Sequence, residues 1–500
     1  MKLYKVIALI GVSLVMLTSC KKEFLDAPKP ENGTLTDNII FSTKAGAENA
    51  LTGIYWIFRS ENYNGYYGYP NNSGNLTNRG LQTSMFFFEV RGNDLFDGYG
   101  SWWESEGAWE ESSYGRIQTG SRTQQIWDMF YKAINNANAV IKYAPEVAGT
   151  SDAEKEALIA EAKAIRAYSY FWLARAYQFT YAKNPDAPGV PLYTEPASKQ
   201  SEGNPRASLK EIYALIVADL DEAVAKLPVT SVDKYRINKN VAAGILAEVY
   251  QELAMADNTL WQKAIDNAKA ARAGNPLMSN ASYAAGFNDI SNQEWLWGFP
   301  VPEDQSLTYY SQFGYMDQQG GYYRNIFVNS DFVDQFSATD TRKSLFTFNG
   351  VNPAAPARTY ATRKYRSRLA TSITGDILVM RSAEMYLIEA EALAQQKKIP
   401  ESIDVLFELQ SFRDPAAVKP AANITQADLI KIILLERRKE MYGEIGVQFF
   451  DLKRYQLPLE RTGNHPYLLT IPANDPRWLI QLPISEIDAN KNIAPADQNP

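Results

Sequence analysis

The stretch ALIAEAKAIRAYSYFWLARAYQFTY, residues Ala157 to Tyr181, indicates how this 500-residue chain folds. Apolar residues recur every three or four positions along one helical face, and alanines and rings fill most of the remaining positions. A helix that is apolar nearly all round is buried, with neighbours on several sides. The stretch therefore predicts a central helix, which Asn184-Pro185 then stops. From Glu161 onward its charged residues are Glu161, Lys163, Arg166 and Arg175.

Further helical patterns predict a mainly α fold. Two pairs of segments are joined by short polar turns and carry small residues that would let antiparallel helices nest, as in degenerate tetratricopeptide-type hairpins. These patterns predict a bundle of tetratricopeptide-like helix pairs. The expected helices run from about Thr123 to Tyr143, and over Leu209–Leu227, Val241–Ala254, Trp261–Ala273, Met385–Ala394, Glu401–Leu409, Leu429–Tyr442 and Val447–Tyr455.

The N-terminus has the features of an export signal. Lysines precede an apolar run from Val6 to Leu17, which is too short to span a bilayer, and Leu17-Thr18-Ser19-Cys20 follows. Residues 1–19 are predicted to be a lipoprotein signal peptide, with Cys20 as the lipidated first residue of the mature protein. The alternative is an ordinary secretory peptide cleaved nearby. Acyl chains on Cys20 would anchor the protein in a membrane without a transmembrane helix.

Composition narrows the function classes. The chain has 45% hydrophobic and 21% charged residues, which is typical of a globular protein with a large core. A net charge of −7 argues against nucleic acid as a partner. Because Cys20 is the sole cysteine, an exported chain would be held together by packing alone. No convincing linker follows Pro30, so one compact unit is expected.

Two irregular stretches interrupt the helical patterning. Residues 65–109 and 279–374 are rich in Gly, Asn, Tyr and Trp and show no sustained period, which predicts loops carrying many large rings. Within the second stretch, Glu294–Phe299 alternates and predicts a short strand with Trp295 and Trp297 on one side, assigned mainly to the core.

Five blocks in sequence order resemble the SusD/RagB family. They are IWDMFYKAINNANAVI, the segment Ala162–Pro196 that ends in GVPLYTEP, DILVMRSAEMYLIEAEAL, LLERRKEMYGEIGVQFFDLKRY and LPISEIDANKNIAPADQNP. Gln448 replaces a more common basic residue of the fourth block, and Leu482-Pro483-Ile484 replaces the usual Pro-Ile-Pro. With the lipobox in front, the resemblance covers the whole mature chain, divided into an N-terminal part, 20–232, and a C-terminal part, 233–500.

The resemblance implies a surface-exposed lipoprotein of the cell outer membrane. Such a protein would bind a nutrient, most often a glycan, at an irregular, aromatic-rich, ligand-facing region, and would deliver it to a TonB-dependent transporter. The RagB branch also allows peptide ligands. The matched blocks are mostly helical framework, so they do not identify the ligand.

Catalytic and metal chemistry have little support in the sequence. His465 is the sole histidine and precedes a proline in a Gly-Asn turn, so a Ser–His or Cys–His pair would depend on one poorly placed residue. A zinc site of histidines and cysteines is excluded in practice, and no metal or other cofactor is expected. Segment 93–98 lacks calcium-ligand spacing. Paired carboxylates for glycoside hydrolysis stay open, although a solvated acidic loop is the favoured interpretation; the candidates are Glu104, Glu106, Glu110 and Glu111.

The loop aromatics carry the ligand hypothesis. A sugar ring has an apolar C–H face edged with hydroxyls, so its binding requires flat rings for stacking and nearby polar groups. Two competing classes remain, a protein-binding helical-repeat scaffold without a small ligand and a secreted hydrolase. The scaffold explains the helix pairs equally well but explains the Tyr/Trp-rich loops poorly. The predicted ligand contacts are Trp102, Trp103, Tyr309, Tyr310, Tyr315 and Tyr322.

Overall fold

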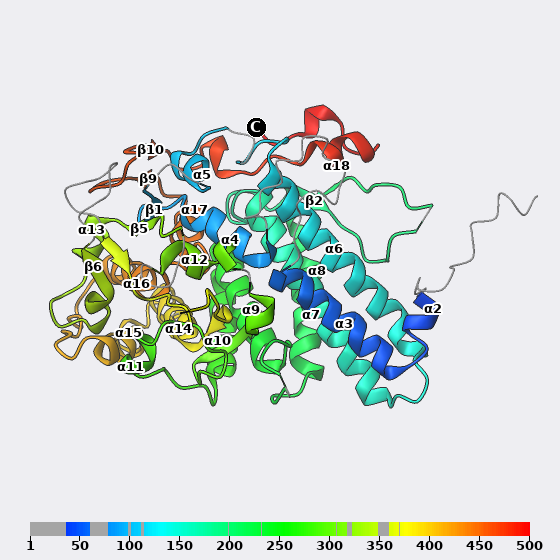
Figure 1. Cartoon of the computed structure of the whole chain (residues 1–500), viewed down its shortest axis with the longest axis horizontal. Helices are drawn as coiled ribbons and strands as arrows, with labels where there is room; N and C mark the ends of the chain where they lie inside the picture. Colours follow the sequence, from blue (N-terminus) through cyan, green and yellow to red (C-terminus); the bar gives the residue numbers. More distant parts are fainter. Residues whose placement is uncertain are drawn as a thin grey trace, which may run out of the picture.

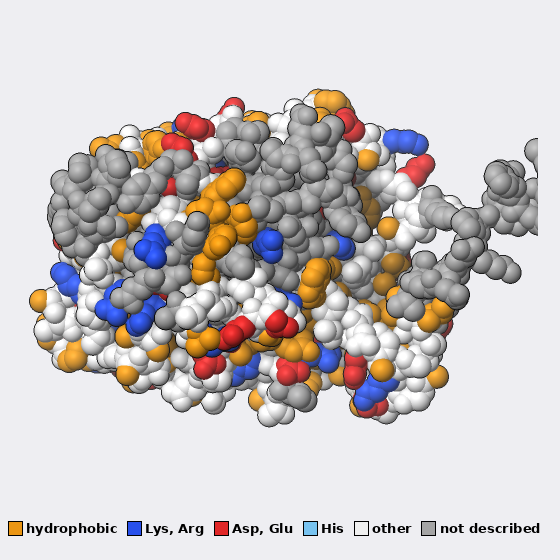
Figure 2. All heavy atoms as spheres, in the orientation of Figure 1, with side chains coloured by type: hydrophobic (Ala, Val, Ile, Leu, Met, Phe, Trp, Pro, Cys, Tyr) orange, Lys and Arg blue, Asp and Glu red, His pale blue; other side chains and the backbone are white. Residues whose placement is uncertain are grey.

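The architecture is mainly helical, with short strands, several of which lie together at one end of the molecule (Figure 1). The computed structural model describes residues 37–60, 79–98, 102–111, 115–198, 200–231, 233–306, 308–317, 323–348, 360–369 and 371–500. Acidic and basic side chains are interspersed over the face drawn in Figure 2. The longer helices are α3 (Lys44–Ser60), α6 (Ser121–Tyr143), α7 (Asp152–Tyr177), α8 (Leu209–Lys226), α9 (Lys239–Leu253), α10 (Trp261–Arg272), α14 (Ser382–Gln395), α15 (Ile399–Arg413), α16 (Gln426–Met441) and α17 (Val447–Arg454).

Helix α7 is the buried central helix that the sequence predicts. It begins with a capping box, in which the Ser151 hydroxyl accepts from the Glu154 N–H and the Glu154 carboxylate accepts from the Ser151 N–H. Trp172 is buried, with its ring 5.9 Å from that of Phe130 on α6. The helix ends at Tyr177, before the predicted end at Tyr181, because the next residue takes an extended conformation.

The expected helix pairs are present. Helices α9 and α10 pack closely, as do α14 and α15, and α14 also lies against α10. Small residues meet between α9 and α10, since a Cβ added to Gly244 on α9 would lie 3.6 Å from the Cβ of Ala271 on α10. The pairs therefore form a continuous helical body (Figure 1).

The first irregular stretch contains a helix that sequence reasoning missed. Helix α4 (Gly80–Glu89) lies inside the segment predicted to be loop, and every one of its residues is buried. A helix covered on all sides has no polar face, so its sequence GLQTSMFFFE shows no amphipathic period. The prediction of loop for residues 65–109 was therefore wrong over this segment.

The short strands connect distant parts of the chain. A sheet of order β1-β5-β7-β6 contains β1 (Leu95–Asp97), β5 (Ile326–Val328), β7 (Tyr360–Thr362) and β6 (Phe346–Phe348). The predicted strand is β4 (Trp295–Phe299), which pairs antiparallel with β8 (Ile377–Arg381). Every residue of β4 is buried, and its register shifts beside Trp297, so both of its faces contribute to the core. Trp295 is buried in the core, as predicted.

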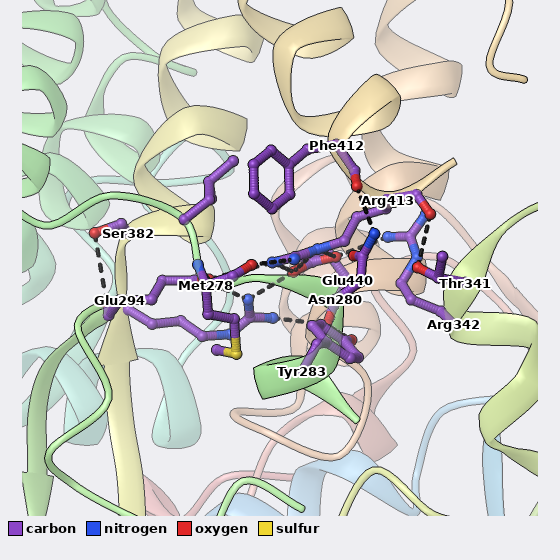
Figure 3. A network of polar contacts seen from close by, with 12 residues as sticks. Met278, Asn280, Tyr283, Glu294, Thr341, Arg342, Ser382, Phe412, Arg413 and Glu440 are labelled. Carbon is purple, nitrogen blue, oxygen red and sulfur yellow. Dashed lines mark hydrogen bonds and ion pairs between the residues drawn. The ribbon is translucent and has the colours of Figure 1, made fainter. Parts of the chain in front are cut away.

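The ERRKE block of α16 forms a buried charge network (Figure 3). The Glu440 carboxylate accepts hydrogen bonds from the guanidinium groups of Arg342, Arg381 and Arg413. The Glu294 carboxylate also accepts hydrogen bonds from Arg381 and Arg413, so these two arginines lie between the two glutamates. All five side chains are buried, and their partners come from segments far apart in sequence. This block of the chain is therefore structural rather than ligand-facing.

Candidate functional site

Pairing of β1 with β5 brings the two irregular stretches together. Leu95, Phe96 and Asp97 lie opposite Val328, Phe327 and Ile326 in an antiparallel register. The chain after β1 leads to Trp102 and Trp103, and the chain before β5 carries the tyrosines of the second stretch. The two irregular stretches, far apart in sequence, are therefore neighbours in the fold.

Asp97 forms hydrogen bonds to both irregular stretches, the first at Trp103 and the second at Asn325. Its carboxylate accepts from the Trp103 N–H, 3.1 Å away, and from the Asn325 side-chain amide at 3.2 Å. The Gly98 N–H also donates to the Asn325 carbonyl at 2.8 Å. Asp97 is buried, so these bonds are shielded from water and fix the position of the neighbouring rings.

Four rings at the molecular surface form what we call the ring platform: Trp102, Tyr309, Tyr310 and Tyr323. The Tyr323 ring lies 6.4 Å from Trp102, 6.1 Å from Tyr309 and 5.9 Å from Tyr310, so it joins the first stretch to the second. Tyr309 is 41% exposed, and the other three rings are partly buried. These four rings can offer faces to a ligand.

Two of the predicted contacts lie beneath this layer. Trp103 is 1% exposed and Tyr315 is 2% exposed, and each packs against Phe86 of α4. The Arg122 guanidinium lies 4.1 Å from the centre of the Trp103 ring. The assignment of Trp103 and Tyr315 as ligand contacts is corrected accordingly: their surfaces are covered by protein, and their rings support the platform from below.

Two predicted residues fall outside the described structure. Tyr322 lies outside the described residues, as does Cys20, so the roles assigned to them stay predictions from sequence. Tyr323 was not among the predicted contacts although it links the platform. The sequence feature that could have indicated Tyr323 is its position directly after Tyr322, in a pair of adjacent tyrosines. The structure places the Tyr323 ring against Tyr315 and within the ring platform.

Backbone geometry holds the second half of the platform. The Gly314 carbonyl of α12 (Gln312–Met316) accepts from the N–H groups of Tyr323 and Arg324. A Cβ on Gly314 would lie 2.2 Å from the Tyr309 carbonyl oxygen, so only glycine permits this close approach.

Polar and charged groups border the rings. Arg79, just before α4, has its guanidinium 5.8 Å from the centre of the Tyr310 ring, and partial burial lowers its pKa. Arg324 is exposed next to Tyr323. Figure 2 shows hydrophobic side chains at the surface where Figure 1 places α4 and α12, with basic side chains beside them. The residues of the two helices themselves are buried beneath this surface. Sequence reasoning missed Arg79, because its contact with Tyr310 arises only in the fold.

Three of the four candidate carboxylates of the acidic loop contact other side chains of the protein. Glu106 is buried against Arg122, Glu104 accepts from the Tyr467 hydroxyl at 2.6 Å, and Glu111 pairs with Arg116. His465 is buried beside Phe96, where burial and Arg461 keep its pKa well below the usual range. These groups hold neighbouring loops in place.

None of the helices that the structure describes combines the length and apolar character needed to span a bilayer. Within the same residues, no three His, Cys, Asp or Glu side chains are grouped so as to hold a metal ion.

Known proteins share both sequence and fold with this chain. A family model described as "Starch-binding associating with outer membrane" matches residues 75–251, and the SusD family model matches residues 304–500. The SusD-like protein P38 of Formosa agariphila is 23% identical over 91% of this chain and 92% of its own length.

Solved structures agree with these matches. A SusD-like carbohydrate binding protein from Bacteroides vulgatus is 29% identical, with a TM-score of 0.79 over 91% of this chain and 98% of its own. A SusD superfamily protein from Bacteroides thetaiotaomicron shares the fold at 24% identity, with a TM-score of 0.76 over 92% of this chain and all of its own. The matched family consists of binding proteins associated with the outer membrane. Two SusD-type family models match successive parts of this chain, and the structural match to the Bacteroides vulgatus protein covers 91% of it. This chain therefore belongs to the SusD/RagB family.

Proposed function

We propose that this protein binds a glycan on the ring platform, does not cleave it, and delivers it to a TonB-dependent transporter at the cell surface. The observation that carries the proposal is the surface group of four rings assembled across the β1–β5 pairing. A protein-binding helical scaffold would not require tyrosines and a tryptophan gathered at one surface. Family membership adds independent support, since the matched family consists of binding proteins.

The chemistry of the platform suits a sugar chain. Aromatic faces stack against the C–H faces of pyranose rings. Pairs of aromatic rings contribute about 0.5–1.5 kcal/mol beyond the area they bury, and we expect a ring–sugar contact to be of similar size. Arg79 and Arg324 lie beside the rings and can donate hydrogen bonds to hydroxyl oxygens. A shallow surface of several rings would follow an extended chain rather than enclose one monosaccharide.

Affinity electrophoresis in gels that contain purified polysaccharides tests the proposal. We expect at least one neutral polysaccharide to retard the protein, with no new reducing ends after prolonged incubation. New reducing ends that disappear in the Glu104→Gln variant would establish a hydrolase instead. Retardation by none of the polysaccharides, together with saturable binding of oligopeptides, would replace the glycan with a peptide ligand.

Anchoring through Cys20 is the second part of the proposal, and the lipobox supports it. Residues 1–19 would be removed as the signal peptide. Acyl chains on Cys20 would then hold the mature protein, with its N-terminal part 20–232 and C-terminal part 233–500, at the outer membrane. In cells that express Cys20→Ala, we expect the folded protein to move from the membrane fraction to the soluble fraction. Unchanged membrane retention would refute the lipid anchor, whereas Ser19→Thr is a control that keeps the cysteine.

A further inference from the structure

A cavity lies apart from the ring platform. It has a volume of about 590 Å³ and is bordered by α6, by segments 192–198 and 200–204 after β2 (Pro188–Pro191), and by Glu486 of α18 (Ile484–Ala489). In Figure 1, α18 lies close to one end of α6. The volume falls within the range of small-molecule sites, about 300–1,000 Å³. None of the ring-platform residues lines it.

Three aromatic residues form part of the cavity wall. The rings of Trp127 and Tyr131 are 4.6 Å apart, and those of Tyr131 and Tyr193 are 5.9 Å apart. The Tyr131 hydroxyl donates to the Pro191 carbonyl at 2.8 Å, and the Tyr193 N–H donates to the Tyr170 hydroxyl at 2.6 Å. These bonds hold the two tyrosines in place, so the wall is rigid and preformed.

The charged residues of the lining are mainly acidic. Asp128 of α6 and Glu486 of α18 lie close enough that the Glu486 charge raises the pKa of Asp128. Glu195 and Glu202 line the same cavity from segments 192–198 and 200–204. Lys132 is the cationic residue among the described lining residues. Glu195 pairs with Lys142 at 3.1 Å and Glu202 with Lys491 at 3.9 Å, so the negative charge that remains in the described lining lies on Asp128 and Glu486, near Lys132.

Hydrogen bonds orient both inner carboxylates. The Gln124 side-chain amide donates to Asp128 at 2.6 Å and accepts from the Ser485 hydroxyl at 2.7 Å. The Asn490 amide donates to Glu486 at 2.7 Å. Burial, reinforced by Glu486, raises the pKa of Asp128 to about 7 despite the attraction of Lys132, and burial also raises the pKa of Glu486.

We propose that this cavity binds a small organic ammonium ion, held between the carboxylates of Asp128 and Glu486 and the rings of Trp127, Tyr131 and Tyr193. An ammonium group gains from both features, because ring faces attract cations and carboxylates neutralise them. An anion would be repelled by the acidic lining. A neutral molecule of the same shape would gain only the apolar contact.

The proposed site has a defined pH dependence. A cation favours the ionised carboxylates, so it must displace the proton that Asp128 holds below about pH 7. The charged groups that line the cavity around Asp128 are Lys132 on α6, Glu486 on α18, and Glu195 and Glu202 on segments 192–198 and 200–204. Glu195 and Glu202 are paired with Lys142 and Lys491. Affinity for a permanent cation should therefore rise from pH 5.5 to pH 8.

Choline and its neutral isostere 3,3-dimethylbutan-1-ol provide a matched pair of probes, because choline keeps its charge at every pH. Isothermal titration of the purified full-length protein should show saturable choline binding and binding of the isostere that is at least about tenfold weaker. Asp128→Asn should weaken choline binding about tenfold and flatten its pH dependence. Glu486→Gln should also weaken binding, whereas Glu401→Gln, which removes an exposed charge on α15 outside the cavity, should not.

Three results would overturn the proposal: no saturable choline binding, equal binding of the two probes, or full choline affinity in both Asp128→Asn and Glu486→Gln. Melting temperatures of the variants show whether a loss of binding reflects unfolding. If Asp128→Asn does not fold, Glu486→Gln and the comparison of the two probes on the native protein still decide the question.

Discussion

Replacing Glu440 with glutamine should lower the free energy of unfolding by about 3–5 kcal/mol, because it leaves buried guanidinium groups without their shared anion. Arg381 and Arg413 donate to one Glu440 oxygen at 2.6 and 3.0 Å, and Arg342 donates to the other at 2.8 Å. These cations hold the pKa of Glu440 well below its ordinary value, so the carboxylate is ionised at neutral pH. Glutamine keeps the shape but removes the charge, and its amide hydrogens would face the guanidinium donors.

Chemical denaturation followed by circular dichroism measures this loss. Glu156→Gln is the matched control, since Glu156 makes an exposed ion pair with Lys226 at 2.9 Å and such pairs contribute only about 0–1 kcal/mol. We expect a large fall in the denaturation midpoint for Glu440→Gln and almost none for Glu156→Gln. Equal midpoints for the two variants would mean that the buried network does not hold the α16 region together.

The helical scaffold could be predicted because its signals are local. The near-continuous apolar character of α7 and the paired Ala-rich segments depend only on residues a few positions apart. Helix α4 escaped the same reasoning because it is buried on every side and carries glycine, serine and threonine in its first turns. Its helical form is set by the elements that pack around it.

Which rings reach the surface could not be read from the sequence. Trp102 and Trp103 are adjacent and chemically identical, yet Trp103 is buried against Phe86 while Trp102 stays partly exposed. The difference arises from the Asp97 hydrogen bonds and from α4, both of which exist only in the folded chain. Similarly, the charges of the ERRKE block are visible in the sequence, but the partners of Glu440, such as Arg381 and Arg413, come from β8 and α15.

Removal of two platform rings should weaken glycan binding at least about tenfold, because each stacked ring contributes about 0.5–1.5 kcal/mol beyond its buried area and a tenfold change equals 1.4 kcal/mol. The variant combines Trp102→Ala with Tyr310→Ala, one ring from each stretch. Both rings are only partly buried, so the melting temperature should change little. Trp295→Ala should do the reverse, since Trp295 is buried in the core and its loss leaves a cavity.

Isothermal titration of the glycan identified in the gel screen, with wild type, the Trp102→Ala/Tyr310→Ala variant and Phe412→Ala, tests the central claim most directly. Phe412 on α15 is 42% exposed, close to the 41% of Tyr309, so its replacement removes an exposed ring without touching the platform. The platform account predicts wild-type affinity for Phe412→Ala and a loss of at least about tenfold for the double variant, with both proteins folded. Wild-type affinity in the folded double variant would contradict it and place the glycan elsewhere on the protein.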